Sequence, residues 1–445
     1  MPALIRPITA LLIATAIVLM GSGLIGVLLP LRAGVVGMSG MEIGLVGSAY
    51  WIGLTLGCLL APSIIRRVGH IRAFVAFTAS VTISPLMIAL TDEAVAWGVL
   101  RVVNGACLAG IQMIIESWLS ASATSETRGR IFAVYTILNL TVLTIGMQLV
   151  GLAPVSGFEL FTVAAILFSL AAVPIALTAS PEPPAPARAA LDLEGLVTTS
   201  PSAVIAALSM GLTGGAFWSF APLFGQAGGL DAVASAGLMT AAILTGALTQ
   251  WPIGVLSDAF GRRQMLVVVT GLSALGALLL SAIATAGASP QALFTAAGIY
   301  GLVAFAGYPL ALAHANDRVP KSQAIAISSG LMLTYAAGAM VGPLIAATML
   351  DTFGATRLFY YSATIHATTS ALILLRLRLR PVEREPFREE FVIAPRTTPA
   401  AYALDPRAEP PAAPPAGTPA TPAAQPVPPP GTASPEPPAR PAETR

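Results

Sequence analysis

The chain has 445 residues, of which 55% are hydrophobic and 10% are charged, and its mean hydropathy is +0.79. A soluble domain carries roughly 25% charged residues, so this composition excludes a water-soluble globular protein and indicates an integral membrane protein. The formal net charge of +2 gives no indication of a nucleic-acid partner.

Motifs of the common catalytic and metal sites are missing from the sequence. Cys58 and Cys107 both lie in apolar segments, where they form neither a disulfide framework nor a metal site. Lysine occurs once, at Lys321, and follows Pro320 rather than a glycine-rich phosphate loop. We therefore expect no enzyme, no cofactor and no metal ion.

Charge and proline content divide the chain into four regions. Residues 1–178 and 202–380 are long and apolar, and residues 179–201 between them read as a polar linker. Residues 381–445 hold 19 of the 37 prolines. Such a tail buries too little apolar surface to offset the entropy of ordering, so we expect it to be disordered.

Each long apolar region contains six apolar runs. They lie at about 8–30, 43–65, 71–91, 94–117, 131–153 and 158–178, and at about 202–223, 232–256, 264–286, 291–315, 323–349 and 354–376. A spanning helix needs about 20 apolar residues, and lipid offers the backbone no hydrogen-bond partners. The sequence therefore predicts an all-α membrane protein with 12 transmembrane helices in two six-helix bundles.

Basic residues gather at one set of helix ends. If the N-terminus is cytoplasmic, the opposite side carries only Arg32 and Arg357. The cytoplasmic side then carries Arg6, Arg66, Arg67, Arg72, Arg128, Arg130, Arg262, Arg263, Arg318, Lys321, Arg376, Arg378 and Arg380. By the positive-inside rule this asymmetry predicts that both termini, the linker and the tail are cytoplasmic.

The two long regions also resemble each other in sequence. The basic turn around Gly69 superimposes on the basic turn around Gly261 with an offset of 192 residues, and the same offset aligns the first run with the seventh. Membrane proteins built from two such repeats hold their substrate between the repeats, near mid-membrane. We therefore expect a pseudo-symmetric pair of bundles with a site at their interface.

Three strings stand out in the sequence: Gly254-Val-Leu-Ser-Asp258-Ala-Phe-Gly261-Arg262-Arg263, Arg101-Val-Val-Asn104-Gly105 and Gly338-Ala-Met-Val-Gly342-Pro343. They resemble signatures of the major facilitator superfamily. There are also four shorter strings, Gly47-Ser-Ala-Tyr50, Glu116-Ser-Trp118-Leu, Arg128-Gly-Arg130 and His314-Ala-Asn316-Asp317-Arg318. These are similar to strings of its bacterial YcaD-like branch. The resemblance covers residues 1–380.

This resemblance implies a secondary transporter of the bacterial inner membrane that works by alternating access, as a monomer. The first copy of the loop motif departs from the family pattern, because Arg66 stands at the position of the loop aspartate and Pro62 at that of the leading glycine. The first copy therefore lacks the carboxylate that forms the family's conformational lock.

Arg101 and Glu116 are the two charges well inside the apolar runs. With Asn104, Leu108 and Gln112 they share one face of a helix. A charge at the bilayer centre costs about 2.5–3.5 kcal/mol on insertion scales, so this face is expected to line a wet cavity or the bundle interior. Arg101 either orients an anionic or polar substrate, or tunes a proton site, or is a structural arginine held by carbonyl groups and Asn104.

The expected substrate and coupling cavity combines this face with aromatic residues from other runs. Its members are Arg101, Asn104, Gln112, Tyr50, Trp218 and Tyr335. Glu116 lies nearer the cytoplasmic end, where it is either a proton-coupling carboxylate or a gate residue paired with Arg66, Arg67 or Arg128.

The remaining candidate residues belong to the cytoplasmic turns and to helix packing. A second gate cluster contains Asp258, Arg262, Arg263 and Asp317, with His314 and Arg318 beside it and Gly69, Arg130, Gly254 and Gly261 in the loop motifs. Charges that pair in one state only would bias the conformational equilibrium, whereas the plainer interpretation is that these basic turns only set topology. Gly338, Gly342 and Pro343 are expected to pack helices closely.

These observations lead to a ranked set of functions. The first is a secondary active transporter of a small organic solute, coupled to protons. An uncoupled facilitator and a drug or metabolite efflux pump are the alternatives within the same class. A different class is a membrane sensor or scaffold whose proline-rich tail, with Pro428-Pro-Pro430, recruits partners.

Overall fold

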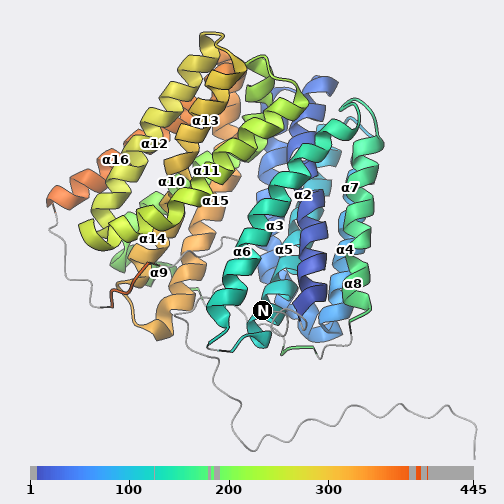
Figure 1. Cartoon of the computed structure of the whole chain (residues 1–445), viewed down its shortest axis with the longest axis horizontal. Helices are drawn as coiled ribbons and strands as arrows, with labels where there is room; N and C mark the ends of the chain where they lie inside the picture. Colours follow the sequence, from blue (N-terminus) through green and yellow to red (C-terminus); the bar gives the residue numbers. More distant parts are fainter. Residues whose placement is uncertain are drawn as a thin grey trace, which may run out of the picture. The chain divides into compact units, whose positions relative to one another are not determined.

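The computed structural model describes residues 8–124, 126–178, 182–184, 191–379, 387–391 and 398. Within these ranges the chain is helical, without a β-strand. Twelve spans are long and apolar enough to cross a membrane (Figure 1). The all-α fold with 12 transmembrane helices predicted from the sequence is confirmed.

The first six spans cover residues 9–176. They are α2 (Thr9–Val36), α3 (Gly40–Val68), α4 (His70–Ile88), α5 (Ala94–Ser122), α6 (Arg128–Gln148) continued by η2 (Leu149–Leu152), and α7 (Glu159–Leu170) continued by α8 (Ala172–Ala176). The largest difference from the predicted ends is at α2, which continues beyond 30 to Val36. Pro30 lies inside this helix without ending it.

The second six spans cover residues 201–379. They are α10 (Pro201–Ala227), α11 (Ala232–Phe260), α12 (Arg262–Thr285), α13 (Pro290–Ala304) with α14 (Gly307–Asn316), α15 (Lys321–Phe353), and η3 (Ala355–Arg357) with α16 (Leu358–Leu379). The helix breaks between α13 and α14, where Pro309 has no N–H to donate to the carbonyl of Phe305.

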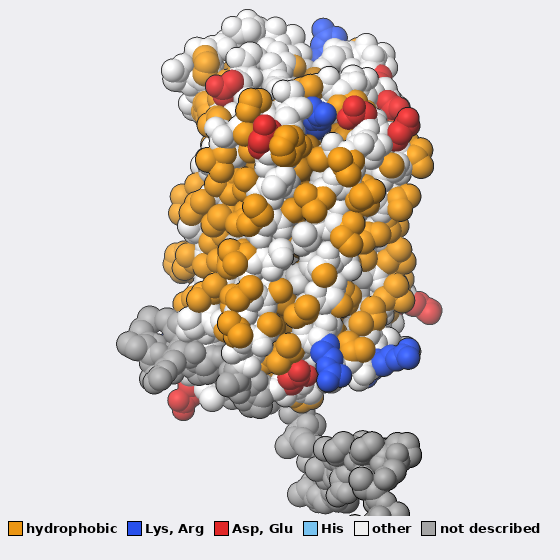
Figure 2. Space-filling model, turned by 90° about the vertical axis from the view of Figure 1, so that its right-hand side faces the viewer, with side chains coloured by type: hydrophobic (Ala, Val, Ile, Leu, Met, Phe, Trp, Pro, Cys, Tyr) orange, Lys and Arg blue, Asp and Glu red, His pale blue; other side chains and the backbone are white. Residues whose placement is uncertain are grey.

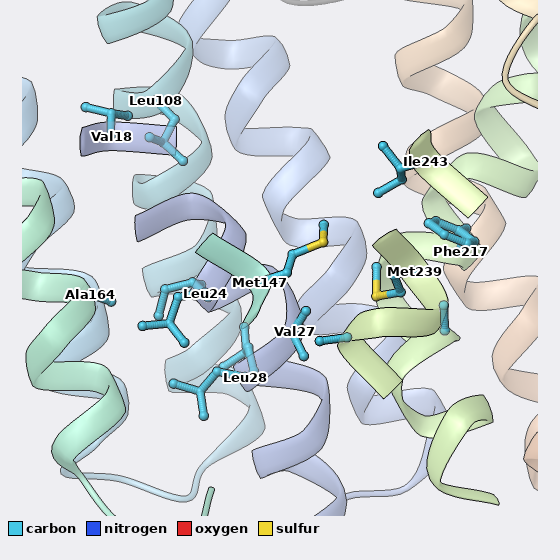
Figure 3. Packing of buried hydrophobic residues seen from close by; sticks show 14 of the residues in the cluster. Val18, Leu24, Val27, Leu28, Leu108, Met147, Ala164, Phe217, Met239 and Ile243 are labelled. Atoms are coloured by element: carbon cyan, nitrogen blue, oxygen red, sulfur yellow. The ribbon is translucent and has the colours of Figure 1, made fainter. Parts of the chain in front are cut away.

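Helix packing groups these spans into two halves. In the first half α3 packs on α5, α2 on α6 and α4 on α7, and in the second half α10 packs on α15, α12 on α16 and α11 on α13. The two halves meet mainly through α3 and α15, with further contacts between α2 and α10 and between α6 and α11. Val27 and Met147 of the first half and Met239 of the second belong to one buried hydrophobic cluster (Figure 3).

Glycines allow the closest helix contacts. A Cβ atom at Gly53 of α3 would lie 2.1 Å from the carbonyl oxygen of Val102 on α5. On α15, Cβ atoms at Gly338 and Gly342 would lie 2.3 and 2.0 Å from carbonyl oxygens of α10. Pro343 follows, and its carbonyl approaches Gly44 of α3. Larger side chains at these positions would therefore push the helix backbones apart.

Two ends of the helical body are distinguished by charge. We call the end with the α3–α4 and α11–α12 turns, which carry Arg66, Arg67, Arg262 and Arg263, the Arg-rich end, and the end with the turns at Gly37 and Gly354 the opposite end. Between them, Figure 2 shows hydrophobic side chains over the middle of one face and most charged side chains near its two ends. This distribution suits a lipid-facing surface.

The halves are joined directly at the opposite end. Asp351, at the end of α15, accepts hydrogen bonds from the backbone N–H groups of Gly40 at 2.8 Å and Met41 at 3.2 Å, in the first turn of α3. Gln148 of α6 donates to the Thr240 hydroxyl of α11 at 3.0 Å. The opposite end is thus closed by polar contacts between the halves.

The linker contains a helix that the sequence interpretation did not include. α9 (Leu193–Thr199) begins where Asp192 accepts a hydrogen bond from the N–H of Gly195 at 2.7 Å, a side-chain N-cap. Leu193 and Leu196 of α9 lie against Gly330 of α15. Residues 179–181 and 185–190 of the linker lie outside the described residues.

The tail, expected to be disordered from residue 381, is described at residues 387–391 and 398. Both parts contact the helical body, so these residues differ from that expectation. The rest of the predicted tail lies outside the described residues, as do Arg6 and Arg380 of the predicted cytoplasmic charges.

Candidate functional site

A central cavity of about 340 Å³ lies between the two halves. Its lining includes all six residues that the sequence placed there, namely Arg101, Asn104, Gln112, Tyr50, Trp218 and Tyr335. α3 and α5 contribute four of them, and α10 and α15 contribute Trp218 and Tyr335. Both repeats therefore form the walls, as expected for a site at the repeat interface.

Arg101 is fixed in this cavity by two neighbours. Its guanidinium carbon lies 4.4 Å from the centre of the Tyr50 ring, within the range of a cation–π contact. Its Nη1 donates to Asn104 Oδ1 at 3.1 Å, one helical turn along α5. Its buried Nε has no hydrogen-bond partner within the described part of the chain. The guanidinium is therefore oriented but retains an unused donor.

The charge of the lining is unbalanced. Among the described residues that line the cavity, Arg101 is the charged one, and aspartate and glutamate are missing from the lining. A partly buried guanidinium without a carboxylate is costly inside the membrane unless another group supplies the compensating charge. The cavity therefore favours an anionic group over a cationic one.

Two polar residues of α6 were missed by the sequence analysis. Thr136 and Asn139 line the cavity, and Thr136 Oγ1 and Asn139 Oδ1 are buried without a hydrogen-bond partner among the described groups. With Leu140 and Leu143 they have the spacing i, i+3, i+4 and i+7, which places all four on one helix face. This polar spacing in an apolar run was the signal that could have identified them.

Aromatic side chains mark the boundary between two cavities. The rings of Trp51 on α3 and Tyr335 on α15 meet edge to face, with 5.7 Å between their centres. The ring centre of Tyr308 lies 5.3 Å from that of Tyr335. A second cavity of about 140 Å³ includes Leu54, which also lines the central one, and continues to Pro62. The Trp51–Tyr335 contact therefore joins the halves between the central cavity and the Arg-rich end.

Glu116 lies one turn beyond the cavity. Its side chain is fully buried, and Glu116 Oε1 accepts a hydrogen bond from the Tyr135 hydroxyl at 3.0 Å. Its other oxygen accepts one from the hydroxyl of Thr398. The predicted gate residues Arg66, Arg67 and Arg130 are exposed, and Arg128 is buried.

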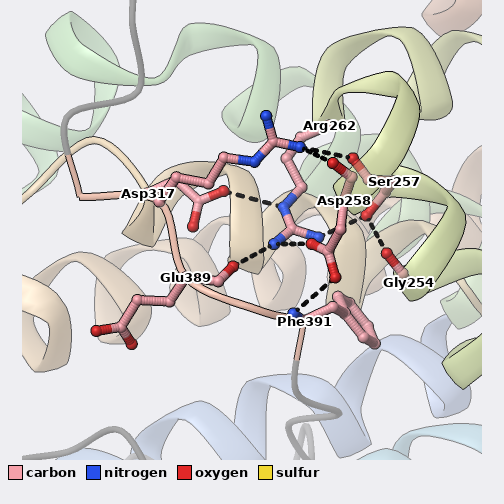
Figure 4. Close-up of polar contacts among 8 residues, drawn as sticks. Gly254, Ser257, Asp258, Arg262, Asp317, Glu389 and Phe391 are labelled. Carbon is pink, nitrogen blue, oxygen red and sulfur yellow. Dashed lines mark hydrogen bonds and ion pairs between the residues drawn. The ribbon is translucent and has the colours of Figure 1, made fainter.

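The second predicted gate cluster is built around Arg262 (Figure 4). This arginine is fully buried. Its Nη2 lies 2.7 Å from Asp258 Oδ1 and its Nε 2.9 Å from Asp317 Oδ2, and its Nη1 donates to the Ser257 hydroxyl at 2.5 Å. These partners belong to the second half, so the contacts join α11, α12 and the end of α14. Arg263 and His314 are also buried nearby in the chain.

The remaining motif residues shape the turns. Gly69 and Gly261 have φ values of +86° and +94°, a region that favours glycine. Both precede a helix directly, α4 and α12. Arg318 donates from Nη1 to the carbonyl of Thr199 in α9 at 2.9 Å, so it holds the linker helix against the second half.

The sequence matches the family model of the Major Facilitator Superfamily over residues 11–244 and 203–423. The chain belongs to the major facilitator superfamily. Its relatives in this superfamily include the MFS-type transporter YcaD of Salmonella typhi, 28% identical over 388 residues that cover 86% of this chain and 97% of the relative. YcaD of an Escherichia coli O17 strain is 28% identical over 377 residues, 83% of this chain and 96% of the relative.

Solved structures of the superfamily share the fold at low sequence identity. The nucleoside transporter NupG superimposes with a TM-score of 0.70 at 15% identity, covering 84% of this chain and 99% of NupG. A D-xylose-proton symporter superimposes with a TM-score of 0.62 at 13% identity, covering 82% and 96%. The chain is thus a multi-pass membrane protein of a transporter family.

Proposed function

We propose that the protein is a secondary active transporter that moves a small organic anion by alternating access between its two halves. The observation that carries this proposal is Arg101, the charged group among the described residues that line a central cavity between the two repeats. Arg101, Asn104 and Gln112 bind the anionic group. The two halves expose this cavity to one membrane face and then the other, and the protein acts as a monomer.

The electrostatic reason is a simple comparison of charges. At an effective dielectric constant of 20, an anion about 4 Å from the guanidinium gains roughly 4 kcal/mol of Coulomb energy. A neutral analogue gains none of it and leaves the Nε donor of Arg101 unsatisfied. A cation would be repelled by a similar amount, which disfavours a cationic drug as the solute.

The rest of the lining selects for an apolar body. Apart from a few amides and hydroxyls, the walls are aliphatic and aromatic, with Trp218, Tyr335 and Phe305 among them. A cavity of about 340 Å³ is at the small end of ligand sites. These features favour a compact anion with one charged group and an apolar or aromatic remainder.

The same family membership supports an assignment of orientation and coupling. The Arg-rich end faces the cytoplasm of a bacterium, so both termini lie on the cytoplasmic side of the inner membrane. Coupling to protons uses Glu116, a buried carboxylate one turn from Gln112. The missing carboxylate in the described cavity lining favours a second candidate, an uncoupled facilitator for the same anion.

Uptake into proteoliposomes tests the proposal. Aromatic and aliphatic monocarboxylates would be compared with their neutral amides, with and without an imposed pH gradient. We expect carboxylates to be preferred, and the Arg101→Ala variant to reduce their uptake at least about 30-fold, equivalent to about 2 kcal/mol. Normal uptake by Arg101→Ala would reject the site.

Coupling is read from the same measurement. Accumulation above the external concentration that depends on the pH gradient supports proton coupling, and Glu116→Gln should then abolish accumulation while exchange continues. Equilibration without accumulation in the native protein supports the uncoupled facilitator instead.

A further inference from the structure

Residues 387–391, which follow α16, bind along the Arg-rich end of the second half (Figure 4). The backbone N–H of Phe387 donates to the carbonyl of Asp317 at 3.2 Å. The N–H of Phe391 donates to Asp258 Oδ2 at 3.1 Å. The two acceptors are the residues that flank Arg262, so the segment lies directly on the loop-motif cluster.

Side chains of the segment add charged contacts. Arg262 Nη2 donates to the carbonyl of Glu389 at 2.8 Å, and the Lys321 ammonium lies 2.7 Å from Glu389 Oε1. Arg388 donates to the carbonyl groups of Ser257, at 3.2 Å, and Asp258. The Ser257 carbonyl also accepts the N–H of Gly261 at 3.0 Å, and Asp258 is in the last turn of α11, where carbonyl groups lack partners within the helix.

Phe391 is the apolar anchor of this segment. Its side chain is 7% exposed, whereas that of Phe387 is 46% exposed. A Cβ atom at Gly254 would lie only 1.9 Å from Phe391 Cδ1, so the ring occupies the space that this glycine leaves on α11. The Arg262 guanidinium carbon lies 5.7 Å from the ring centre, within cation–π range.

A second anchor lies on the other half. Thr398 is fully buried, and its hydroxyl donates to Glu116 on α5. Residues 387–391 and Thr398, which we call the C-terminal anchor, therefore contact both halves. Phe391 and Thr398 are seven positions apart in the sequence, so their Cα atoms lie at most about 24 Å apart.

Both anchor points lie just beyond the cavity lining. Gln250 of α11 and Gln112 of α5 line the central cavity. Gly254 and Glu116 each follow four residues later, about 6 Å along the same face of their helix. The faces of α5 and α11 that line the cavity thus also contact the C-terminal anchor, closer to the Arg-rich end.

From these contacts we propose that the C-terminal anchor is an autoinhibitory contact that holds the halves in the arrangement with the opposite end closed. When the opposite end opens, the Arg-rich ends of α5 and α11 approach each other, and Phe391 and Thr398 occupy those helix faces. The anchor must release for that step, so it slows the cycle. This inference rests on the proposed alternating access but not on the proposed substrate.

Spin-label distances in the full-length protein test it without any substrate. Cys58→Ser and Cys107→Ser remove the native thiols, and labels are placed at Val95→Cys and Ala286→Cys, exposed sites of the two halves at the opposite end. A long distance between the two labels reports an open opposite end, and a short one a closed end. The variant with Phe391→Ala and Thr398→Val should raise the ratio of long to short label distances about fivefold or more. Phe387→Ala, which removes an exposed ring from the same segment, should leave the ratio unchanged.

Further variants separate the outcomes. If the double variant does not fold, Thr398→Val alone should raise the ratio about twofold, and Thr398→Ser, which keeps the hydroxyl, should not. An unchanged distribution in the folded anchor variants overturns the proposal. Asp351→Ala, which breaks the direct contact at the opposite end, then shows which proposal fails. If the label distances shift in Asp351→Ala, alternating access stands and only the anchor proposal fails. If they do not shift in that variant either, the proposed alternating access is rejected as well.

Discussion

At the scale of single residues, Arg262 shows how a buried charge can stabilise this fold. It is fully buried between Asp258 and Asp317, and Asp317 is itself only 2% exposed. Removing the arginine leaves carboxylates without their countercharge, which typically costs 3–5 kcal/mol for a buried pair. We expect Arg262→Met to lower the thermal unfolding temperature in detergent by roughly 5 °C or more.

A matched control lies on the other repeat. Arg66 is exposed and donates to the nearby Ser63 hydroxyl at 3.3 Å, so Arg66→Met should change stability by less than about 0.5 kcal/mol. Equal unfolding temperatures for the two variants would show that the Arg262 cluster contributes no more than a surface arginine.

The cavity residues could be predicted because their signals are local. Arg101 and Asn104 stand out in an apolar run, and the helix repeat places Gln112 on the same face. Thr136 and Asn139 carry the same kind of signal, but uncharged residues in a membrane helix give a weaker contrast. The Trp51–Tyr335 contact could not be predicted, because it depends on how α3 meets α15 across the halves.

At the scale of elements, Asp351 joins α15 to the first turn of α3. It accepts two backbone N–H bonds there, and a carboxylate at a helix N-terminus gains about 0.3–1 kcal/mol from the helix dipole when exposed. Because this contact exists only while the opposite end is closed, Asp351→Ala should raise the fraction of opposite-end-open molecules. Spin labels at Val95→Cys and Ala286→Cys measure that fraction.

Asp231 provides the control at the same end. It caps α11 through Ala234, at 2.7 Å, within its own half. Asp231→Ala removes a similar cap without touching the contact between halves, so it should leave the fraction of open molecules unchanged. A similar opening in both variants would attribute the effect to general destabilisation.

Element prediction succeeded where length and hydropathy decide, and failed where a short segment depends on a distant partner. The twelve spans follow from runs of about 20 apolar residues. α9 and residues 387–391 sit in polar, proline-containing sequence, so composition pointed away from structure. Their order comes from contacts with Gly330 and Gly254, glycines that are far away in the sequence.

At the scale of the whole molecule, the two repeats have the same basic turn, but a different carboxylate contacts the turn in each. In the second repeat, Asp258 and Arg262 form the cluster at the turn of Gly261. In the first repeat Arg66 replaces that aspartate, and Glu182 of the linker accepts the N–H groups of His70 at 2.9 Å and Ile71 at 3.4 Å instead. The pseudo-symmetry is therefore kept in the backbone, while carboxylates come from different parts of the chain.

In the whole molecule, the Trp51–Tyr335 contact lies between the central cavity and the Arg-rich end. Since the opposite end is closed by Asp351 and Gln148, a reagent reaches the cavity from the Arg-rich end past these two rings. Trp51→Ala should therefore speed maleimide labelling of Leu108→Cys, a cavity position, about tenfold in protein lacking the two native cysteines. Trp251→Ala removes a tryptophan that is 62% exposed, away from this contact, and should leave the rate unchanged. If both variants label at the native rate, the Trp51–Tyr335 contact does not limit access to the cavity.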